Sequence, residues 1–212
     1  MRMCLYSLVA AVTIPASVLG CANQEPTSGP AAGSATVRSA SKETHTVKTE
    51  KATFGAGCFW GVQAEFSKVP GVVSTRVGYC GGKTKSPTYK EVCTDETGHA
   101  EVIEIDFDPT KVSYEQLVDI FWELHDPTTL NRQGLDEGTQ YRSVIFYHSA
   151  EQERIAKASK EQLEKAGAFR NPIVTQIVPA PTFYPAEEYH QHYFEKKGMA
   201  GSCHIRTPRK KN

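Results

Sequence analysis

Residues 51–80 read KATFGAGCFWGVQAEFSKVPGVVSTRVGYC and contain two strand patterns on either side of a helix pattern. Residues 51–56 form a short run with apolar positions, closed by glycines, which predicts a strand. In residues 73–79 the side chains of Val, Thr, Val and Tyr alternate with Ser, Arg and Gly, and this period of two predicts a second strand. Pro70 and Gly71 end the helix that lies between these strands. Its apolar residues recur at the spacing of one helical face, and they are Phe59, Val62, Phe66 and Val69.

The rest of the chain continues this alternation of strands and helices. Residues 81–98 are rich in Gly, Lys, Ser, Pro and Thr and predict a long loop. The order strand-helix-strand-strand-helix-strand-helix-strand contains a split βαβ unit. We therefore predict an α+β fold with a ferredoxin-like split βαβ core, a two-layer α/β sandwich, and a long irregular C-terminal tail. The later elements are a strand over 99–107, a helix from a Ser113/Gln116 capping box to Leu124, a strand over 141–147, a helix from Ser149 to Gly167 and a strand over 173–178.

The composition of the whole chain restricts its class. The chain has 212 residues with 39% hydrophobic side chains, which is ordinary for a globular protein of one or two domains. Its 24 basic and 24 acidic side chains balance, which argues against nucleic-acid binding. No apolar run reaches the roughly 18 residues needed to span a bilayer. The six cysteines include no C-x-x-C pair, which argues against a zinc knuckle and a thioredoxin-type dithiol.

The first 21 residues have the pattern of an export signal. One basic residue precedes the apolar stretch 8–19, which is too short to span a membrane. The ending Val18-Leu19-Gly20-Cys21 is similar to a bacterial lipobox, in which Cys21 would be lipidated. The alternative is simple cleavage after Ala22. We expect an exported, membrane-anchored bacterial lipoprotein that faces the periplasm or the cell exterior and contacts the membrane only through this anchor.

Residues 22–48 are rich in Ser, Thr, Ala, Gly and Pro and show no apolar period. Such a segment cannot bury enough surface to offset its ordering entropy, so we expect a flexible linker. Residues 49–212 follow as one catalytic domain without internal repeats. We expect this domain to act as a monomer.

Cys58 is the candidate nucleophile because it lies where a strand gives way to a helix. Free backbone N–H groups and the helix dipole at this junction favour a thiolate. Gly57 and Gly61 let a ligand approach, and Phe59 and Trp60 supply an apolar wall beside the sulfur. The alternative is a buried structural cysteine with two core aromatic residues.

Glu101 is the candidate general acid. Strand alternation puts it on the same face as Ile103, Ile105 and Phe107, the face that is directed at the core. A carboxyl held among apolar groups has a raised pKa and stays protonated near neutral pH, as a general acid requires. The alternative is a glutamate at the strand end that reaches solvent.

Three further polar residues are weaker candidates for substrate binding. Tyr89 lies in the long loop, Tyr141 begins a predicted strand, and Asp136 lies in the turn between Gly134 and Gly138. Phenol hydroxyls bind a developing oxyanion. A tyrosine at a strand end is also common as core packing, and an aspartate in such a turn is common as turn chemistry.

The predicted domain contains four cysteines, Cys58, Cys80, Cys93 and Cys203. An even number in an exported protein allows two structural disulfides. Cys203, however, follows the Gly-rich segment 198–202, and a thiol on such a segment suits attack on a sulfenic acid at Cys58. Cys80 is a weaker candidate for that resolving role, and Cys93 has no flanking glycines and is expected to be inert.

His190 and His192 allow a metal interpretation, with His204 nearby. Their i, i+2 spacing brings them to one face only in an extended segment, whereas residues 186–191 predict a helix. We therefore expect no metal site.

Several motifs together resemble those of the A-class peptide methionine sulfoxide reductases. They run in the family's order from Gly57 to Cys203. One five-residue motif would be weak evidence, but this set in register is highly specific. The motifs are Gly57-Cys58-Phe59-Trp60-Gly61, Pro87-Thr88-Tyr89, Gly98-His99-Ala100-Glu101, the run from Arg132 to Ser143, and Glu187-Glu188-Tyr189-His190-Gln191.

The resemblance implies a role for each matching residue. Cys58 attacks the sulfur of methionine S-sulfoxide in peptides and proteins, and Glu101 protonates the sulfoxide oxygen. Cys203 then condenses with the resulting sulfenic acid at Cys58. The residues that bind substrate are Phe59 and Trp60 at the methyl group, Tyr89 and Tyr141 as further hydrogen-bond donors, and Asp136 at the polar end.

The resemblance also implies that no cofactor is bound and that a thioredoxin-like dithiol supplies electrons. This chain has no cysteine after Cys203, where some family members carry a second recycling cysteine. An export signal excludes cytosolic thioredoxin as the direct donor, so an exported thioredoxin-like partner is implied. Three other functions compete with this interpretation: a cysteine-based peroxidase, a Cys–His hydrolase that uses His99 as its base, and a non-catalytic lipoprotein.

Overall fold

The computed structural model describes residues 48–199, all of which belong to the second of two units of the chain, His45–Asn212. Its main sheet consists of six strands: β1 (Glu50–Ala56), β2 (Val72–Cys80), β3 (Ala100–Phe107), β6 (Ser143–Tyr147), β7 (Gln176–Pro179) and β8 (Tyr184–Pro185). Two short strands, β4 (Arg132–Gln133) and β5 (Asp136–Glu137), form a separate hairpin. The helices are α1 (Phe59–Phe66), α2 (Tyr89–Val92), α3 (Tyr114–Leu124), α4 (Ala150–Lys165), α5 (Tyr193–Lys196) and the 3₁₀ turn η1 (Thr139–Tyr141).

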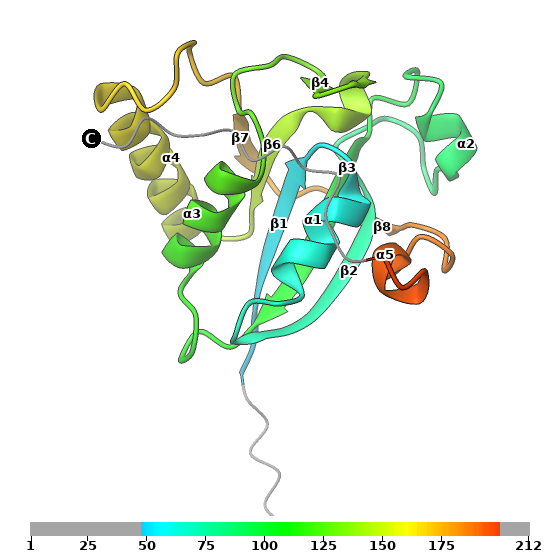
Figure 1. Ribbon diagram of the computed structural model, residues 1–212, viewed down its shortest axis with the longest axis horizontal. Coiled ribbons are helices and arrows are strands. Elements are labelled where there is room, and N and C mark those ends of the chain that lie inside the picture. Colours follow the sequence, from blue (N-terminus) through cyan, green and yellow to red (C-terminus); the bar gives the residue numbers. More distant parts are fainter. Residues whose placement is uncertain (1–47, 200–212) are drawn as a thin grey trace, which may run out of the picture. The chain divides into compact units, whose positions relative to one another are not determined.

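The strand order is β7-β6-β1-β3-β2-β8 (Figure 1). Strand β3 is antiparallel to both β1 and β2, so β1 and β2 are parallel to each other, with α1 as their connection. A parallel pair split by an inserted antiparallel strand is the split βαβ arrangement. The predicted ferredoxin-like core is therefore confirmed.

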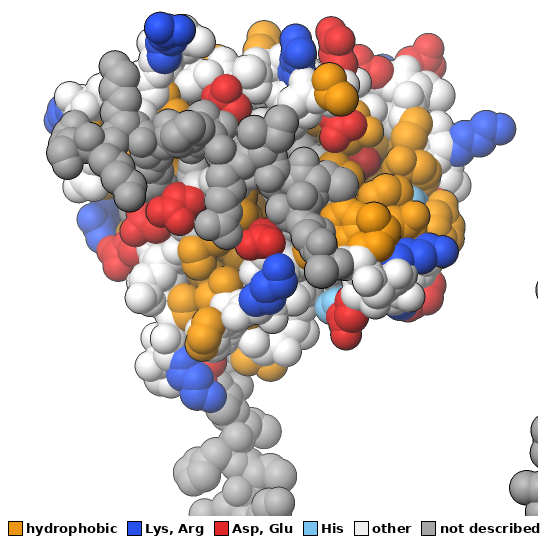
Figure 2. Space-filling view, in the orientation of Figure 1, with side chains coloured by type: hydrophobic (Ala, Val, Ile, Leu, Met, Phe, Trp, Pro, Cys, Tyr) orange, Lys and Arg blue, Asp and Glu red, His pale blue; other side chains and the backbone are white. Residues whose placement is uncertain are grey.

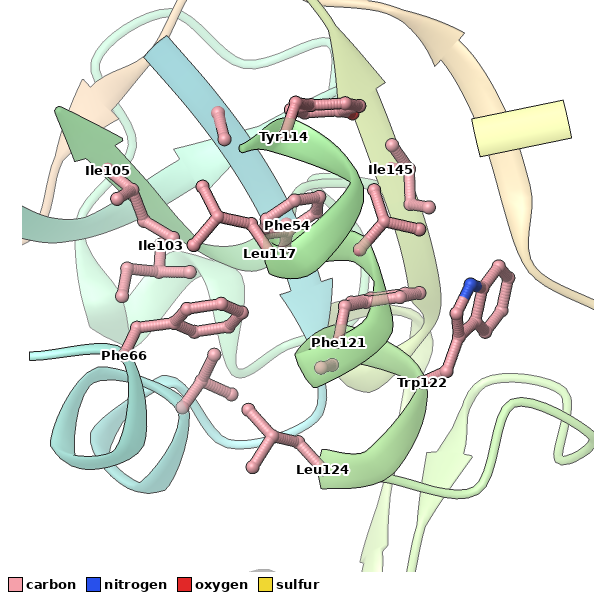
Figure 3. Close-up of a cluster of buried hydrophobic side chains, with 14 of the residues drawn as sticks. Phe54, Phe66, Ile103, Ile105, Tyr114, Leu117, Phe121, Trp122, Leu124 and Ile145 are labelled. Atoms are coloured by element: carbon pink, nitrogen blue, oxygen red, sulfur yellow. The ribbon is translucent and has the colours of Figure 1, made fainter. Parts of the chain in front are cut away.

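Helices α1, α3 and α4 cover one face of the sheet (Figure 1). Phe54, at the centre of β1, lies 5.5 Å from the ring of Phe66 in α1 and 5.3 Å from that of Phe121 in α3. Figure 3 shows these rings interleaved with Leu117 and Ile103. Burial of this apolar surface is the main force that holds the helices on the sheet.

The opposite face of the sheet has a thinner cover. There the side chains of Ala180 and Phe183, from the segment that links β7 to β8, pack against Cys80, Val102 and Phe146. Because side chains alternate along β2, Tyr79 lies on the helix-covered face and Cys80 on this opposite face.

Local capping explains where several elements begin. Ser113 and Gln116 form the predicted capping box at the start of α3. Thr88 and Glu91 form a second box that starts α2 inside the segment predicted as a loop, so that prediction was wrong over four residues. None of the helices in the described residues is long and apolar enough to cross a membrane.

Three other predicted elements differ from the structure. The strand predicted over 173–178 is β7, which begins only at Gln176. Tyr141 closes η1 through its N–H, which donates to the Gly138 carbonyl at 3.1 Å, so the strand begins only at Ser143. Residues 188–192 form turns, so the helix predicted over 186–191 is absent. The reason is that the Gln191 side chain bonds to both the N–H and the C=O of Val77, which fixes the segment against β2.

Candidate active site

Cys58 occupies the junction between β1 and α1, as predicted. It is the N-cap residue of α1 and is half-buried. Gly57 has a φ of 87°, a left-handed backbone that glycine adopts without strain and that turns the chain from the strand into the helix. The sulfur thus lies at the positive end of the helix dipole.

Glu101 lies next to this helix start. The backbone N–H of Phe59 donates to its Oε2 at 3.0 Å, and the residue is only 2% exposed. Burial raises the pKa of Glu101 to about 8, against the lowering effect of that hydrogen bond, and the charge of Asp136 adds to the rise. Glu101 therefore lies buried on the core-directed face beside the start of α1, and its raised pKa favours the neutral carboxyl.

Tyr89, Tyr141 and Asp136 are brought to the same place from three segments. Burial raises the pKa of both phenols. In Tyr89 a hydrogen bond with the Cys93 side chain raises it further, and the charge of Glu101 adds to the rise in each phenol. The charges of Asp136 and Cys58 also act on Tyr141. Burial raises the pKa of Asp136 as well. Both phenols are hydrogen-bond donors at neutral pH, and both lie close enough to Glu101 to feel its charge.

Phe59 and Trp60 form an aromatic wall that is supported by His190. The Trp60 indole N–H donates to His190 Nδ1 at 3.0 Å, and its ring stacks on Tyr193 at 3.9 Å. His190 is 1% exposed and lies 4.3 Å from the ring of Tyr89. Figure 2 shows hydrophobic side chains gathered on the surface where α1, α2 and α5 lie. His190 and Tyr193 were not among the predicted site residues, although His190 belongs to a motif that the resemblance used.

Glu187 joins the aromatic wall to α2. Its carboxylate accepts from the Tyr89 N–H at 2.9 Å and from the Tyr79 hydroxyl at 3.0 Å. These hydrogen bonds outweigh burial and hold the pKa of Glu187 below its usual range. The charged carboxylate thus fixes the backbone from which Tyr89 projects.

His99 is not available as a base for Cys58. Its Nδ1 accepts from the Gly82 N–H at 3.2 Å, and its Nε2 lies 2.8 Å from the Thr84 carbonyl oxygen. A Cβ on Gly82 would lie 2.3 Å from the His99 ring, so this close approach requires glycine. The imidazole therefore anchors the loop that precedes α2, and the geometry does not support a Cys–His hydrolase.

The other described cysteines differ in their surroundings. Cys80 is buried on the far face of the sheet, and burial raises the pKa of its thiol to about 12. A thiol that stays protonated is a poor nucleophile, so Cys80 does not suit the resolving role. Cys93 is exposed at the end of α2, and its side chain hydrogen-bonds with the Tyr89 phenol, although the sequence predicted an inert cysteine. Cys203 and the lipobox residue Cys21 lie outside the described residues.

Within residues 48–199, no three His, Cys, Asp or Glu side chains are grouped in a way that would hold a metal ion. His190 Nδ1 accepts a hydrogen bond from the Trp60 indole N–H. His192 lies at the start of α5, with its Nδ1 3.3 Å from a carboxylate oxygen of Glu195.

Comparisons with known proteins agree with the motifs. A family model described as peptide methionine sulfoxide reductase matches residues 50–212. The peptide methionine sulfoxide reductase MsrA of Methanosarcina acetivorans is 65% identical over 150 residues, which cover 71% of this chain and 80% of that protein. MsrA of Geobacter sulfurreducens is 64% identical over 154 residues, which cover 73% of this chain and 94% of that protein.

Solved structures show the same likeness. Mxr1 from Saccharomyces cerevisiae in its reduced form is 37% identical with a TM-score of 0.69, and the match covers 78% of this chain and 94% of that one. Methionine sulfoxide reductase A of Corynebacterium diphtheriae is 41% identical with a TM-score of 0.65, covering 75% of this chain and 80% of that one. At these identities the likeness extends beyond the fold alone.

Proposed function

This chain belongs to the family of peptide methionine sulfoxide reductases, oxidoreductases that reduce methionine sulfoxide, and from that premise we propose how its own residues perform the reaction. The Cys58 thiolate attacks the sulfur of methionine S-sulfoxide. The carboxyl of Glu101 donates a proton to the sulfoxide oxygen, and the oxygen is transferred to the cysteine. Methionine leaves as the reduced product, and Cys58 is left oxidised by two electrons as a sulfenic acid.

One observation carries this proposal. The Phe59 N–H donates to Glu101 Oε2 at 3.0 Å, which puts a buried carboxyl at the backbone position directly after Cys58. With a pKa of about 8, this carboxyl is protonated at neutral pH and has a proton to give. A thiolate and a neutral acid side by side are the two groups that attack on a sulfoxide requires.

The remaining site residues bind substrate in this proposal. Phe59 and Trp60 enclose the methyl group of the sulfoxide, and the indole is held for this by His190 and Tyr193. The phenols of Tyr89 and Tyr141 donate hydrogen bonds to the oxygen as negative charge develops on it. Asp136 orients the polar end of the substrate.

The catalytic cycle closes through a disulfide. The Cys203 thiol attacks the sulfenic sulfur of Cys58, a disulfide forms, and water leaves. A thioredoxin-like dithiol then reduces this disulfide, so the two electrons pass through cysteines and the reaction needs no bound cofactor. Free methionine sulfoxide is a second substrate if the site contacts only the side chain of the methionine sulfoxide and not the peptide backbone.

The test uses the purified chain, dithiothreitol and separated S and R epimers of a methionine sulfoxide peptide. We expect turnover of the S epimer alone, loss of turnover in Cys58→Ser, and turnover within about twofold in Cys80→Ala, a thiol control on the far face of the sheet. A folded chain that reduces neither epimer would contradict the proposal, and so would an active Cys58→Ser variant.

A second experiment tests the disulfide step without reductant. The unaltered chain is expected to release one methionine per molecule and to lose two thiols. Cys203→Ser is expected to release the same amount of methionine but to retain a sulfenic acid, which dimedone traps at Cys58. A disulfide between two other cysteines would overturn the assignment of Cys203.

We also propose that the chain is exported and anchored as a lipoprotein. The lipobox-like ending at Cys21 and the Ser/Thr/Gly/Pro-rich segment 22–48 support this proposal. The electron donor then lies on the same side of the membrane, and the catalytic domain acts as a monomer. Labelled palmitate incorporated by a bacterial host into the full chain, and lost in Cys21→Ala, is the expected result. Unlabelled, soluble chain with cleavage after Ala22 would favour the simple leader.

A further inference from the structure

Helix α2, which begins with Tyr89, is too short to hold itself in place. It contains four residues, and an isolated helix of that length is not stable. Of its residues, only Val92 is buried in the core. The position of the Tyr89 phenol therefore depends on contacts that α2 makes with other segments.

A carboxylate holds α2 at each end. At the first residue, Glu187 accepts from the Tyr89 N–H at 2.9 Å. Just beyond the last residue, Asp95 donates its own N–H to the Val92 carbonyl at 3.1 Å. The Asp95 side chain turns away from α2, because its Oδ1 accepts from the Thr139 N–H at 2.7 Å and also from the Thr139 hydroxyl. Thr139 lies 44 residues further along the chain.

The segment that Asp95 reaches is the one that carries Tyr141. Thr139 is the first residue of η1, and Tyr141 is the last. The Thr139 carbonyl accepts from Arg142 Nη1 at 2.9 Å, so both the N–H and the C=O of Thr139 are bound by charged side chains. One carboxylate thus ties the element of one phenol to the element of the other.

The backbone of Asp95 supports a specific role for its side chain. Its φ is 64°, in the left-handed region that disfavours residues with a Cβ, although aspartate tolerates it better than most. A glycine would relieve this strain but would lose both hydrogen bonds to Thr139. Aspartate at this position therefore keeps the hydrogen bonds to Thr139 at the expense of some backbone strain.

We propose that Asp95 and Glu187 are positioning residues, which fix α2 at its two ends and thereby hold the phenols of Tyr89 and Tyr141 at the spacing that the sulfoxide oxygen requires. This inference rests on the proposed role of the two phenols as donors. Neither carboxylate touches the substrate. They act by fixing the positions of α2 and η1 relative to each other. A displacement of about 1 Å of a catalytic or binding group lowers the rate by up to about 100-fold.

The main test is Asp95→Gly in the full chain. Glycine removes the carboxylate and suits a φ of 64°, so the fold is not strained by the change. We expect the single-turnover rate on the S-sulfoxide peptide to fall about five- to tenfold, because the bond to Thr139 is exposed and water competes for it. The urea unfolding midpoint is expected to stay unchanged. Asp95→Asn keeps an acceptor oxygen and is expected to restore the rate to within about twofold.

Matched controls separate position from charge. Glu96→Gln removes the neighbouring exposed carboxylate and is expected to leave the rate unchanged. Glu187→Ala removes the hydrogen bonds to the Tyr89 N–H and the Tyr79 hydroxyl, and we expect the rate to fall about tenfold. Glu188→Ala changes the adjacent exposed residue, and we expect its rate to stay unchanged.

A double variant distinguishes positioning from general loosening. If Asp95 acts through the Tyr141 phenol, Asp95→Gly adds less than about twofold once Tyr141→Phe has removed that hydroxyl. An Asp95→Gly enzyme with the unaltered rate, or one whose loss multiplies fully with that of Tyr141→Phe, would overturn the inference. Failure of the unaltered chain to reduce the S epimer would overturn the proposed function, and this inference with it.

Discussion

At the scale of single residues, the site depends on a carboxyl that is kept neutral by its surroundings. Glu101 is 2% exposed and has one backbone hydrogen bond, from the Phe59 N–H, which favours its charged form. Burial outweighs that bond, so the pKa rises from 4.5 to about 8. The residue that the reaction needs as an acid is thus placed where ionisation is disfavoured.

This raised pKa predicts an alkaline limit to activity. Glu101 is protonated below pH 8 and loses its proton above it, so the single-turnover rate is expected to fall as pH rises through about 8. Glu101→Gln cannot donate the proton, and we expect its rate to be about 100- to 10,000-fold lower without this alkaline fall. A rapid-quench pH profile measures both. A profile with the same alkaline limb in Glu101→Gln would assign the titration to another group.

The same residue predicts an effect on stability with a definite sign. In the unfolded chain Glu101 ionises near pH 4.5, whereas in the folded protein it stays neutral to about pH 8. Between these values the unfolded state is favoured increasingly as pH rises. Glu101→Gln removes this effect and is expected to be about 2–4 kcal/mol more stable than the unaltered chain at pH 8. Urea unfolding at pH 5 and pH 8, with Glu96→Gln as the surface control, checks the difference.

Cys80 provides a residue-scale test of the recycling path. Its thiol lies on the far face of the sheet from Tyr79, and burial raises its pKa to about 12. We expect Cys80→Ala to leave dithiol-dependent turnover within about twofold of the unaltered rate, with a loss of stability of about 1 kcal/mol from lost packing. Loss of thioredoxin-dependent turnover, with dithiothreitol-dependent turnover intact, would instead place Cys80 in the cycle.

At the scale of elements, the regular parts of the fold were predictable and the short ones were not. The apolar alternation of β2 and β3 and the helical spacing in α1 depend on local sequence, and they led to the split βαβ core, to Cys58 and to Glu101. The turns over 188–192 depend on bonds between residues far apart, such as that of Gln191 to Val77, which leave no periodic signal. Among the short elements that the sequence analysis missed, α2 alone has a local signal, the Thr88/Glu91 capping box, from which it could have been predicted.

Gln191 shows how one side chain extends the sheet. Strand β8 pairs with β2 only at Gly78 and Tyr79. At Val77 the Gln191 carboxamide replaces a strand peptide, because it accepts from the N–H at 3.0 Å and donates to the C=O at 2.9 Å. The next residue toward the N-terminus is His190, so this contact also sets the position of the aromatic wall.

Removal of this carboxamide is expected to destabilise the protein. Gln191→Ala leaves the Val77 N–H without its partner, whereas the Val77 C=O keeps the hydrogen bond that the Ala186 N–H donates at 3.0 Å. We expect a loss of about 1–3 kcal/mol. Gln162→Ala, an exposed change on α4, is expected to stay within about 0.5 kcal/mol. Urea unfolding compares the two variants. Equal midpoints would mean that water replaces the carboxamide without cost.

At the scale of the whole molecule, the described sheet and helices bring Cys58 and Glu101 together within residues 48–199. The first strand pair joins Glu50 to Phe107, and the hydrogen bonds named here all link residues within 48–199. The core around Phe54 is closed by α1, α3 and α4. We therefore predict that residues 49–212 fold and react without residues 22–48.

A comparison of two purified chains, 22–212 and 49–212, tests this independence. We expect equal thermal unfolding midpoints and single-turnover rates within about twofold on the S-sulfoxide peptide, since a flexible tether adds reach but no packing. Neither chain contains Cys21, so both are free of lipid. A lower midpoint for 49–212 would show that the tether packs on the domain. A lower rate at an equal midpoint would show that the tether contacts the substrate, because the fold that holds Cys58 and Glu101 would then be unchanged.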